Sequence, residues 1–221
     1  MLEHQDKDRV SVGPAHFAYL RERTTREDAF LVQLRIEAEK AGLPPIAIQP
    51  EQGAMLQVLL RLCNAREAIE VGTLGGYSAI WMARALPDDG RVRTIELDPE
   101  RANFAEHWIA RSDVAGKIEV HRGAGADVLR KFAADSADAA FLDADKAGYP
   151  GYLRECLRIV RVGGLIAADN ALAFGQLLDA KPSDPDVPAV RAFNDLVPKV
   201  PELQAVIVPL GDGMWVGVRV R

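Results

Sequence analysis

The chain has 221 residues, of which 48% are hydrophobic and 27% are charged, and its formal net charge is −5. This composition is typical of one globular domain with a full-sized core, and the acidic balance without a basic stretch excludes nucleic acid as an expected partner. The polar N-terminus does not resemble a signal peptide and no apolar run is long enough to cross a membrane, so we expect a cytoplasmic protein with no membrane contact.

Two helices are expected before the sheet begins. Thr24–Glu27 fits a capping box at the start of a helix over 24–42, and a proline starts a second helix over 50–64. Residues 1–64 are too few to bury a core alone. We therefore assign them to an added helical layer of a single domain whose α/β core spans 65–221.

Beyond this layer, short apolar runs alternate with helix-like segments. The runs predict strands near 67–71, 91–97, 117–121, 138–143 and 164–169. The intervening patterns predict helices near 77–86, 99–112, 125–133 and 149–160, with a further helix near 188–197. Two last strands around Gly211–Gly213 predict an antiparallel hairpin at the sheet edge. The fold class is therefore α/β, a doubly wound Rossmann-like fold with a mostly parallel sheet of seven strands.

Four acids end, or nearly end, four of these apolar runs: Glu70, Glu96, Asp143 and Asp169. In a parallel α/β sheet, ligands bind outside the carboxyl ends of the strands. The four carboxylates are therefore expected along one rim of the sheet. Such a row indicates a site that handles hydroxyl groups, a cation, or both.

The segment Glu70–Ser78 is a glycine-rich loop between the first strand and the next helix. A dinucleotide-binding loop would have glycine where this chain has Glu70, and an acid there repels a pyrophosphate but attracts an ammonium group. Glu96 ends the next strand, where a carboxylate accepts hydrogen bonds from ribose hydroxyls. Together these features favour S-adenosylmethionine, a nucleoside with a cationic amino-acid tail. The alternative is a tight turn with no ligand.

The other half of the rim carries hard oxygen ligands. Asp143, Asp169 and the Asn170 carbonyl lie at the ends of the fourth and fifth strands. Three such ligands suit Mg²⁺, which keeps water or substrate oxygens in its octahedron, and Mn²⁺ and Ca²⁺ share this preference for oxygen. Lys146 follows closely enough to reach the same rim. Taken singly, Asp143 fits a helix cap, Asp169 and Asn170 fit a plain turn, and Lys146 fits a solvated surface charge. Because these residues are expected on the same rim as the glycine loop, a functional site is favoured.

Four motifs follow one another along the chain: Glu70–Ser78, Thr94–Pro99, Phe141–Lys146 and Ala168–Asn170. Together they resemble the cation-dependent O-methyltransferases, which include caffeoyl-CoA and catechol O-methyltransferases. The Asp-Ala-Asp-Lys sequence within the third motif is similar to the caffeoyl-CoA and bacterial branch. The resemblance covers most of the chain and implies a methyltransferase fold with S-adenosylmethionine as methyl donor and a divalent cation.

The resemblance also implies roles for individual residues. The positions that match cofactor contacts are Ile48, Glu70, Gly72, Thr73, Ser78, Glu96, Gly125, Asp143, Asp145 and Tyr152. The positions that match metal ligands are Asp143, Asp169 and Asn170, and the catalytic positions are Lys146 and Asp143. Ile48 and Phe174 depart from the plant enzymes, which have a small polar residue and a substrate-contacting Asn there. The departure at Phe174 leaves the substrate open.

These roles imply transfer of a methyl group to a hydroxyl of a vicinal dihydroxyaryl small molecule that chelates the cation. Lys146 would take the hydroxyl proton or position the hydroxyl, and the family implies a homodimer. One alternative is an NAD-dependent single-domain oxidoreductase, which needs a Tyr-x-x-x-Lys pair; Tyr149 and Tyr152 are followed four residues on by Leu153 and Cys156. Another is a non-catalytic cofactor-binding module, which would lack the metal set or the lysine.

Overall fold

The computed structural model describes residues 13–221. The N-terminal stretch that we distinguished from a signal peptide lies outside this range. Within the described part of the chain, none of the helices combines the length and the apolar character needed to cross a membrane.

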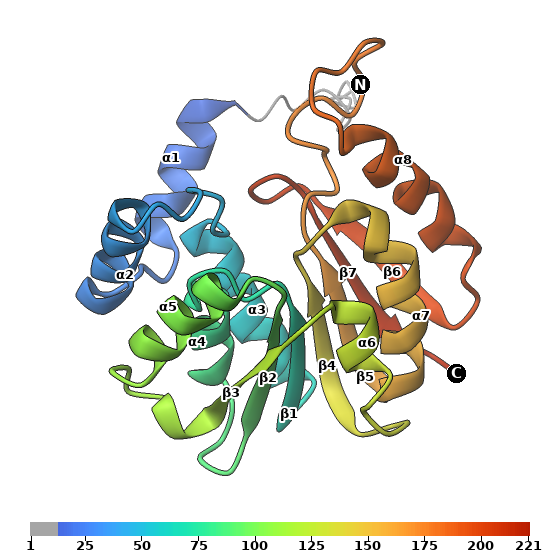
Figure 1. Ribbon diagram of the computed structural model, residues 1–221. Coiled ribbons are helices and arrows are strands. Elements are labelled where there is room, and N and C mark those ends of the chain that lie inside the picture. The colour runs from blue at the N-terminus through green and yellow to red at the C-terminus, as the bar shows by residue number, and fades with distance from the viewer. Residues whose placement is uncertain (1–12) are drawn as a thin grey trace, which may run out of the picture.

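A seven-stranded sheet with the order β3-β2-β1-β4-β5-β7-β6 forms the centre of the molecule (Figure 1). The five strands from β1 to β5 pair in parallel, whereas β7 pairs antiparallel with both β5 and β6. The bounds are β1 (Glu67–Val71), β2 (Arg91–Glu96), β3 (Ile118–Arg122), β4 (Ala137–Leu142), β5 (Val160–Ala168), β6 (Leu203–Val208) and β7 (Met214–Arg219). The predicted fold class, with its C-terminal antiparallel hairpin, is confirmed.

Helices cover both faces of the sheet (Figure 1). They are α1 (Pro14–Arg23), α2 (Ala29–Lys40), α3 (Pro50–Leu62), α4 (Tyr77–Ala83), α5 (Pro99–Ile109), α6 (Gly125–Leu129), α7 (Tyr149–Ile159) and α8 (Val187–Leu196). Single 3₁₀ turns lie at Ala115–Lys117, Lys146–Gly148 and Val197–Lys199. The sequence pattern did not predict α1.

The predicted capping box at Thr24–Glu27 is wrong. The helix α2 begins at Ala29, and its cap is Asp28, whose side chain accepts a hydrogen bond from the backbone N–H of Leu31 at 2.9 Å. Glu27 does not serve the cap because its carboxylate accepts hydrogen bonds from Arg35 and from the Tyr77 hydroxyl. The carboxylate that the predicted capping box needed is therefore used by Tyr77, which is distant in the sequence.

Two apolar clusters lie on opposite faces of the sheet. In β4, Ala139 and Phe141 belong to the cluster under α2 to α5, whereas Ala140 and Leu142 belong to the cluster under α6 to α8. Because both faces are covered, the central strands are apolar at nearly every position, as buried parallel strands are. The helices α2 and α3 contribute to the first cluster, so the N-terminal layer shares the core of the sheet.

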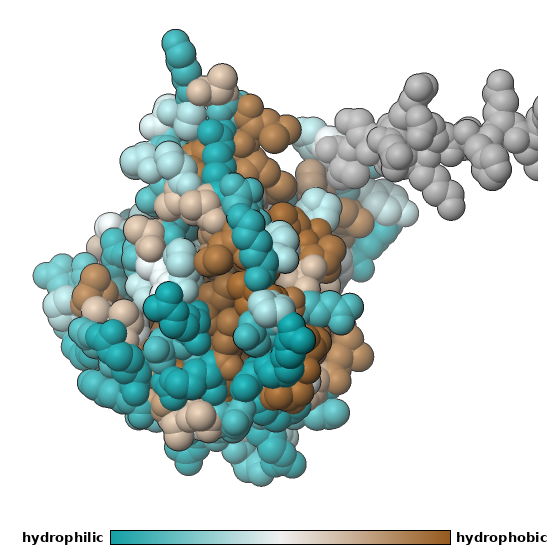
Figure 2. All heavy atoms as spheres, turned by 90° about the vertical axis from the view of Figure 1, so that its right-hand side faces the viewer, coloured by the Kyte–Doolittle hydropathy of each residue, from teal (hydrophilic) through white to brown (hydrophobic). Residues whose placement is uncertain are grey.

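The sheet is less covered at the edge formed by β6 and β7. Val206 of β6 is 58% exposed, and the burial pattern of this strand alternates, whereas β1 and β4 are almost wholly buried. Figure 2 shows the right-hand side of Figure 1, where a band of apolar residues lies between hydrophilic ones. The edge strand thus leaves part of its apolar surface open.

The loop after β1 packs directly against the end of β4. The N–H of Gly72 donates to the Ile95 carbonyl at 3.0 Å, and the N–H of Asp143 donates to the Val71 carbonyl at 2.9 Å. Gly72 has a φ of +104°, and a Cβ atom at this position would overlap the backbone carbonyl oxygen of Asp143. The protein backbone itself therefore requires glycine here, in addition to any ligand that the loop holds.

We expect Gly72→Ala to destabilise the protein more than Gly42→Ala does. Gly42 also has a positive φ, +83°, but a Cβ atom added there would meet no other atom within 4 Å. Gly42→Ala should cost about 1–2 kcal/mol for its left-handed backbone. Gly72→Ala should cost a further ~1–3 kcal/mol because of the overlap with the Asp143 carbonyl after β4. Urea unfolding of both variants measures the difference; equal losses would contradict the close packing of this loop.

Candidate functional site

The strand ends bring the predicted rim acids together. Leu142 of β4 lies beside Ala168 of β5, and the N–H of Asp169 donates to the Leu142 carbonyl at 2.9 Å. Asp143 and Asp169 therefore leave neighbouring strands at the same level. On the other side of β4, β1 pairs with β4 through Val71 and Leu142, which places the glycine loop next to the two aspartates.

Glu70 is a fully buried acid with one unpartnered oxygen. Its Oε2 accepts a hydrogen bond from the Thr94 hydroxyl at 2.5 Å, and that hydroxyl also lies 2.5 Å from the hydroxyl of Thr73. Its Oε1 has no hydrogen-bond partner among residues 13–221. Burial raises the pKa of Glu70 to about 8; the carboxylates of Asp143 and Glu96 add to this, while the neighbouring hydroxyls of Ser78 and Thr94 oppose it. A buried carboxyl group with an unpartnered oxygen is suited to bind a cationic group.

Glu96 holds the glycine loop in place. Its Oε2 accepts from the backbone N–H of Leu74 at 2.8 Å, and its Oε1 accepts from the N–H of Asp98 at 3.0 Å. Each carboxylate oxygen has a second lone pair that these contacts leave free. The end of β2 thus offers an oriented acceptor pair beside the loop.

Tyr152, Asp145 and Gly125 form one contact group next to this loop. The Tyr152 hydroxyl donates to Asp145 Oδ1 at 2.5 Å. A Cβ atom at Gly125 would come within 2.7 Å of Val71 Cγ1 and 2.9 Å of the Tyr152 ring. Packing between the tyrosine and β1 therefore explains why this position is glycine. Ile48, in contrast, is buried within the core cluster under α2 to α5.

The second half of the rim contains a buried carboxylate, Asp169, a partly buried one, Asp143, and the amide of Asn170. Burial and the neighbouring Asp143 carboxylate raise the pKa of Asp169 to about 7. Burial also raises the pKa of Asp143, whereas the Lys146 ammonium acts to lower it. The Asn170 Nδ2 donates to Asp212 Oδ2 at 3.0 Å, so the amide oxygen is left for another partner. Hard oxygen donors beside like charges fit a divalent cation.

This donor set is incomplete without outside ligands. Within the described range, no cluster of three or more His, Cys, Asp or Glu side chains could hold a metal ion. The candidate set has only two acids, and its third member is an amide. A cation at this place would therefore keep coordination positions for water or substrate, as Mg²⁺ sites usually do.

Lys146 is a buried ammonium beside these acids. The residue is only 6% exposed, its Nζ lies 3.2 Å from Asp143 Oδ1, and it donates to the Tyr149 hydroxyl at 2.8 Å. Tyr149 in turn donates to the Leu142 carbonyl at 3.1 Å. The alternative of a solvated surface lysine is therefore wrong. The role of Tyr149 in fixing the ammonium was not predicted, although its spacing of three residues from the lysine matches one turn of helix.

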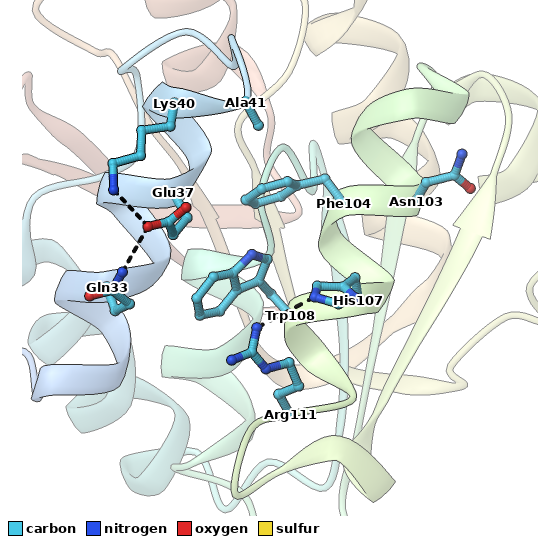
Figure 3. Close-up of a pocket in the computed structure, with 9 residues that line it drawn as sticks. All are labelled: Gln33, Glu37, Lys40, Ala41, Asn103, Phe104, His107, Trp108 and Arg111. Atoms are coloured by element: carbon cyan, nitrogen blue, oxygen red, sulfur yellow. Dashed lines mark hydrogen bonds and ion pairs between the residues drawn. The ribbon is translucent and has the colours of Figure 1, made fainter.

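A large groove lies elsewhere on the molecule, between α2 and α5 (Figure 3). Its volume is about 840 Å³, and it is lined by Gln33, Glu37, Lys40, Ala41, Asn103, Phe104, His107, Trp108 and Arg111. The charges on its walls are matched internally: Gln33 and Lys40 both donate to Glu37 at 2.9 Å, and the Arg111 guanidinium lies 4.7 Å from the centre of the Trp108 ring. None of the predicted site residues lines this groove, so the rim remains the candidate site.

Comparison with known proteins shows the family to which the chain is related. An O-methyltransferase family model matches residues 21–220. The chain is 41% identical over 174 residues to a catechol O-methyltransferase of Niastella koreensis, covering 77% of this chain and 78% of the relative. It is 34% identical over 201 residues to a catechol O-methyltransferase of Mycobacterium tuberculosis, covering 90% and 91%. The crystal structure of an O-methyltransferase from Bacillus cereus in complex with SAH, S-adenosylhomocysteine, superposes with a TM-score of 0.83 at 32% identity, covering 93% and 97%.

The buried acid Glu70 predicts a pH-dependent stability difference. The pKa of its carboxyl in the folded protein is about 8, above the ordinary value of 4.5, so its stabilising contribution is present below pH 4.5 and is lost as the pH rises through 8. Compared with wild type, ligand-free Glu70→Gln should therefore gain at least about 1 kcal/mol between pH 5 and pH 9. Thermal unfolding across this range measures the gain. Glu100→Gln, an exposed control, should show no such trend, and a Glu70→Gln difference that is independent of pH would contradict the assignment.

Proposed function

The chain belongs to the O-methyltransferase family and is an S-adenosylmethionine-dependent O-methyltransferase, and on this premise we propose that it methylates a vicinal dihydroxyaryl small molecule with the help of a divalent cation. The cation, Mg²⁺ on the chemistry of its donors, would be held by Asp143, Asp169 and Asn170. The observation that carries the proposal is the pair of carboxylates at adjacent strand ends, Asp169 buried and Asp143 partly buried beside the Lys146 ammonium. Two relatives are catechol O-methyltransferases, which supports an aromatic diol as the acceptor.

The glycine-loop half of the rim would hold S-adenosylmethionine. Glu70 offers its free Oε1 to the ammonium group of the amino-acid tail, which removes the cost of an unpaired buried acid. Glu96 would accept the ribose hydroxyls with the lone pairs that the loop leaves free. The remaining cofactor contacts that we propose are Ile48, Gly72, Thr73, Ser78, Gly125, Asp143, Asp145 and Tyr152.

Methyl transfer requires an oxygen nucleophile in line with the sulfonium methyl group. The cation, when bound, supplies positive charge that favours the ionised form of a nearby hydroxyl. In this proposal the rim would hold the two reactants side by side, and such placement supplies a large part of a rate enhancement. As the oxygen–methyl bond forms, the methyl–sulfur bond breaks and S-adenosylhomocysteine leaves.

Lys146 is the residue that we propose to act on the acceptor hydroxyl. It lies within 3.2 Å of Asp143, and Tyr149 fixes its amine from the other side. In this place it either accepts the hydroxyl proton or holds the resulting oxyanion by charge. The retention of this lysine together with both acids argues against a non-catalytic cofactor-binding module, and membership of the family excludes an NAD-dependent oxidoreductase. The homodimer and the cytoplasmic location stay predictions.

We expect methylation of a small catechol to require the cation and both residues at its side. Treatment with EDTA should abolish product formation, and Mg²⁺ should restore it. Lys146→Ala should lower kcat by about 10²–10⁴-fold, the usual range for a lost acid–base group, and Asp143→Ala should lower activity because a proposed ligand of the cation is lost, whereas Lys131→Ala, at an exposed lysine, should match wild type. Product formation is followed by chromatography. Full activity in metal-free buffer would refute the proposal.

The variant Lys146→Arg distinguishes the two roles of the lysine. A guanidinium keeps the positive charge but does not give up its proton in a protein. If Lys146 accepts the hydroxyl proton, Lys146→Arg should be as inactive as Lys146→Ala. If it acts by charge alone, the arginine should recover a measurable part of the lost kcat.

A further inference from the structure

A side chain from the N-terminal layer reaches the candidate metal ligands. Gln52 lies in the first turn of α3, is only 2% exposed, and donates its Nε2 to Asp169 Oδ1 at 2.5 Å. The two residues are 117 positions apart in the sequence. One oxygen of Asp169 is therefore already engaged from the side of α3.

The orientation of this amide is fixed by its second contact. The Gln52 Oε1 accepts a hydrogen bond from the backbone N–H of Gln49 at 2.9 Å. Because the oxygen end of the amide is occupied by a donor, the NH₂ end must face the carboxylate. The turn between β6 and β7 encloses the same group: Gly211 has a φ of +60°, and a Cβ atom there would overlap the Gln52 amide.

The neighbouring ligand is held in a similar way from the same turn. Asp212 follows Gly211, and its Oδ2 accepts from the Asn170 Nδ2 at 3.0 Å and from the backbone N–H of Phe174 at 2.8 Å. The Asp212 and Gly213 carbonyls accept the next two backbone N–H groups after Asn170, each at 2.8 Å. The chain leaving β5 is thus attached to the hairpin turn at several points.

We propose that Gln52 is a positioning residue for the cation: it holds one oxygen of Asp169, as Asp212 holds the amide of Asn170, so that the remaining oxygens of both ligands face the rim. Partners of this kind fix the orientation of metal ligands, and their loss typically lowers metal affinity about 10–100-fold. The inference rests on the proposed function, because it assumes that Asp169 and Asn170 hold a cation. It adds that the N-terminal layer takes part in building the cation site.

The test measures two affinities on the same full-length protein. The dissociation constant of Mn²⁺ is measured by electron paramagnetic resonance with saturating S-adenosylhomocysteine, and that of S-adenosylhomocysteine is measured by calorimetry. Gln52→Met removes the donor at similar size. Gln52→Asn keeps an amide on a shorter side chain, and it is measured in the same way if the methionine variant does not fold.

Gln57→Met is the matched control, because Gln57 lies on the same helix and donates its amide to the Trp81 carbonyl at 2.9 Å, away from the rim acids. We expect both Gln52 variants to raise the Mn²⁺ dissociation constant about 10–100-fold. The S-adenosylhomocysteine constant should stay within about twofold of wild type, since the amide of Gln52 bonds to Gln49 and Asp169 and, among residues 13–221, makes no hydrogen bond to the glycine loop. Gln57→Met should change neither constant.

Two results would overturn the inference while leaving the cation in place. One is wild-type Mn²⁺ affinity in the Gln52 variants. The other is an equal loss of both affinities, which would show a general structural role. A third result, wild-type protein that binds no Mn²⁺ or Asp169→Asn protein that binds it normally, would overturn the proposed cation site itself and with it this inference.

Discussion

Two carboxylates at the ends of neighbouring strands, Asp169 buried and Asp143 partly buried, repel each other unless a positive charge lies beside them. Asp143 and Asp169 are in this position because β4 and β5 run in parallel and end at the same level. The repulsion and the burial raise the pKa of Asp169 to about 7. Lys146 provides one buried positive charge, but it contacts Asp143 and not Asp169. The rest of the site can be understood as an arrangement that keeps these like charges together for a cation.

The same constraint explains why distant segments converge on the rim. The glycine loop after β1 must pass close to the backbone of Asp143, which only a glycine at position 72 permits. Gln52 from α3 and Asp212 from the β6–β7 turn supply hydrogen bonds to the ligands on the β5 side. A buried charge without such partners would be strongly destabilising. The added helical layer and the edge hairpin therefore serve the site as well as the core.

Much of this could be predicted from the sequence, because the signals are local. Apolar runs that end in acids located the strands and their carboxyl ends, and the Gly-Asp-Gly turn located the hairpin. The prediction failed where a side chain is bound by a partner that is distant in the sequence. Glu27 could not cap α2 because Tyr77, fifty residues further on, donates to its carboxylate. Likewise, no local pattern shows that Gln52 reaches Asp169 or that Lys146 is buried, because both depend on how layers far apart in the chain pack.

The central claim is that Asp143, Asp169 and Asn170 hold a divalent cation beside the bound methyl donor. Anomalous X-ray diffraction from crystals grown with Mn²⁺ and S-adenosylhomocysteine tests it most directly. The account predicts a single strong anomalous peak within about 2.0–2.6 Å of oxygens of these three side chains, the usual range for hard cations. A crystal with S-adenosylhomocysteine at the glycine loop and no anomalous peak between the two aspartates would contradict it.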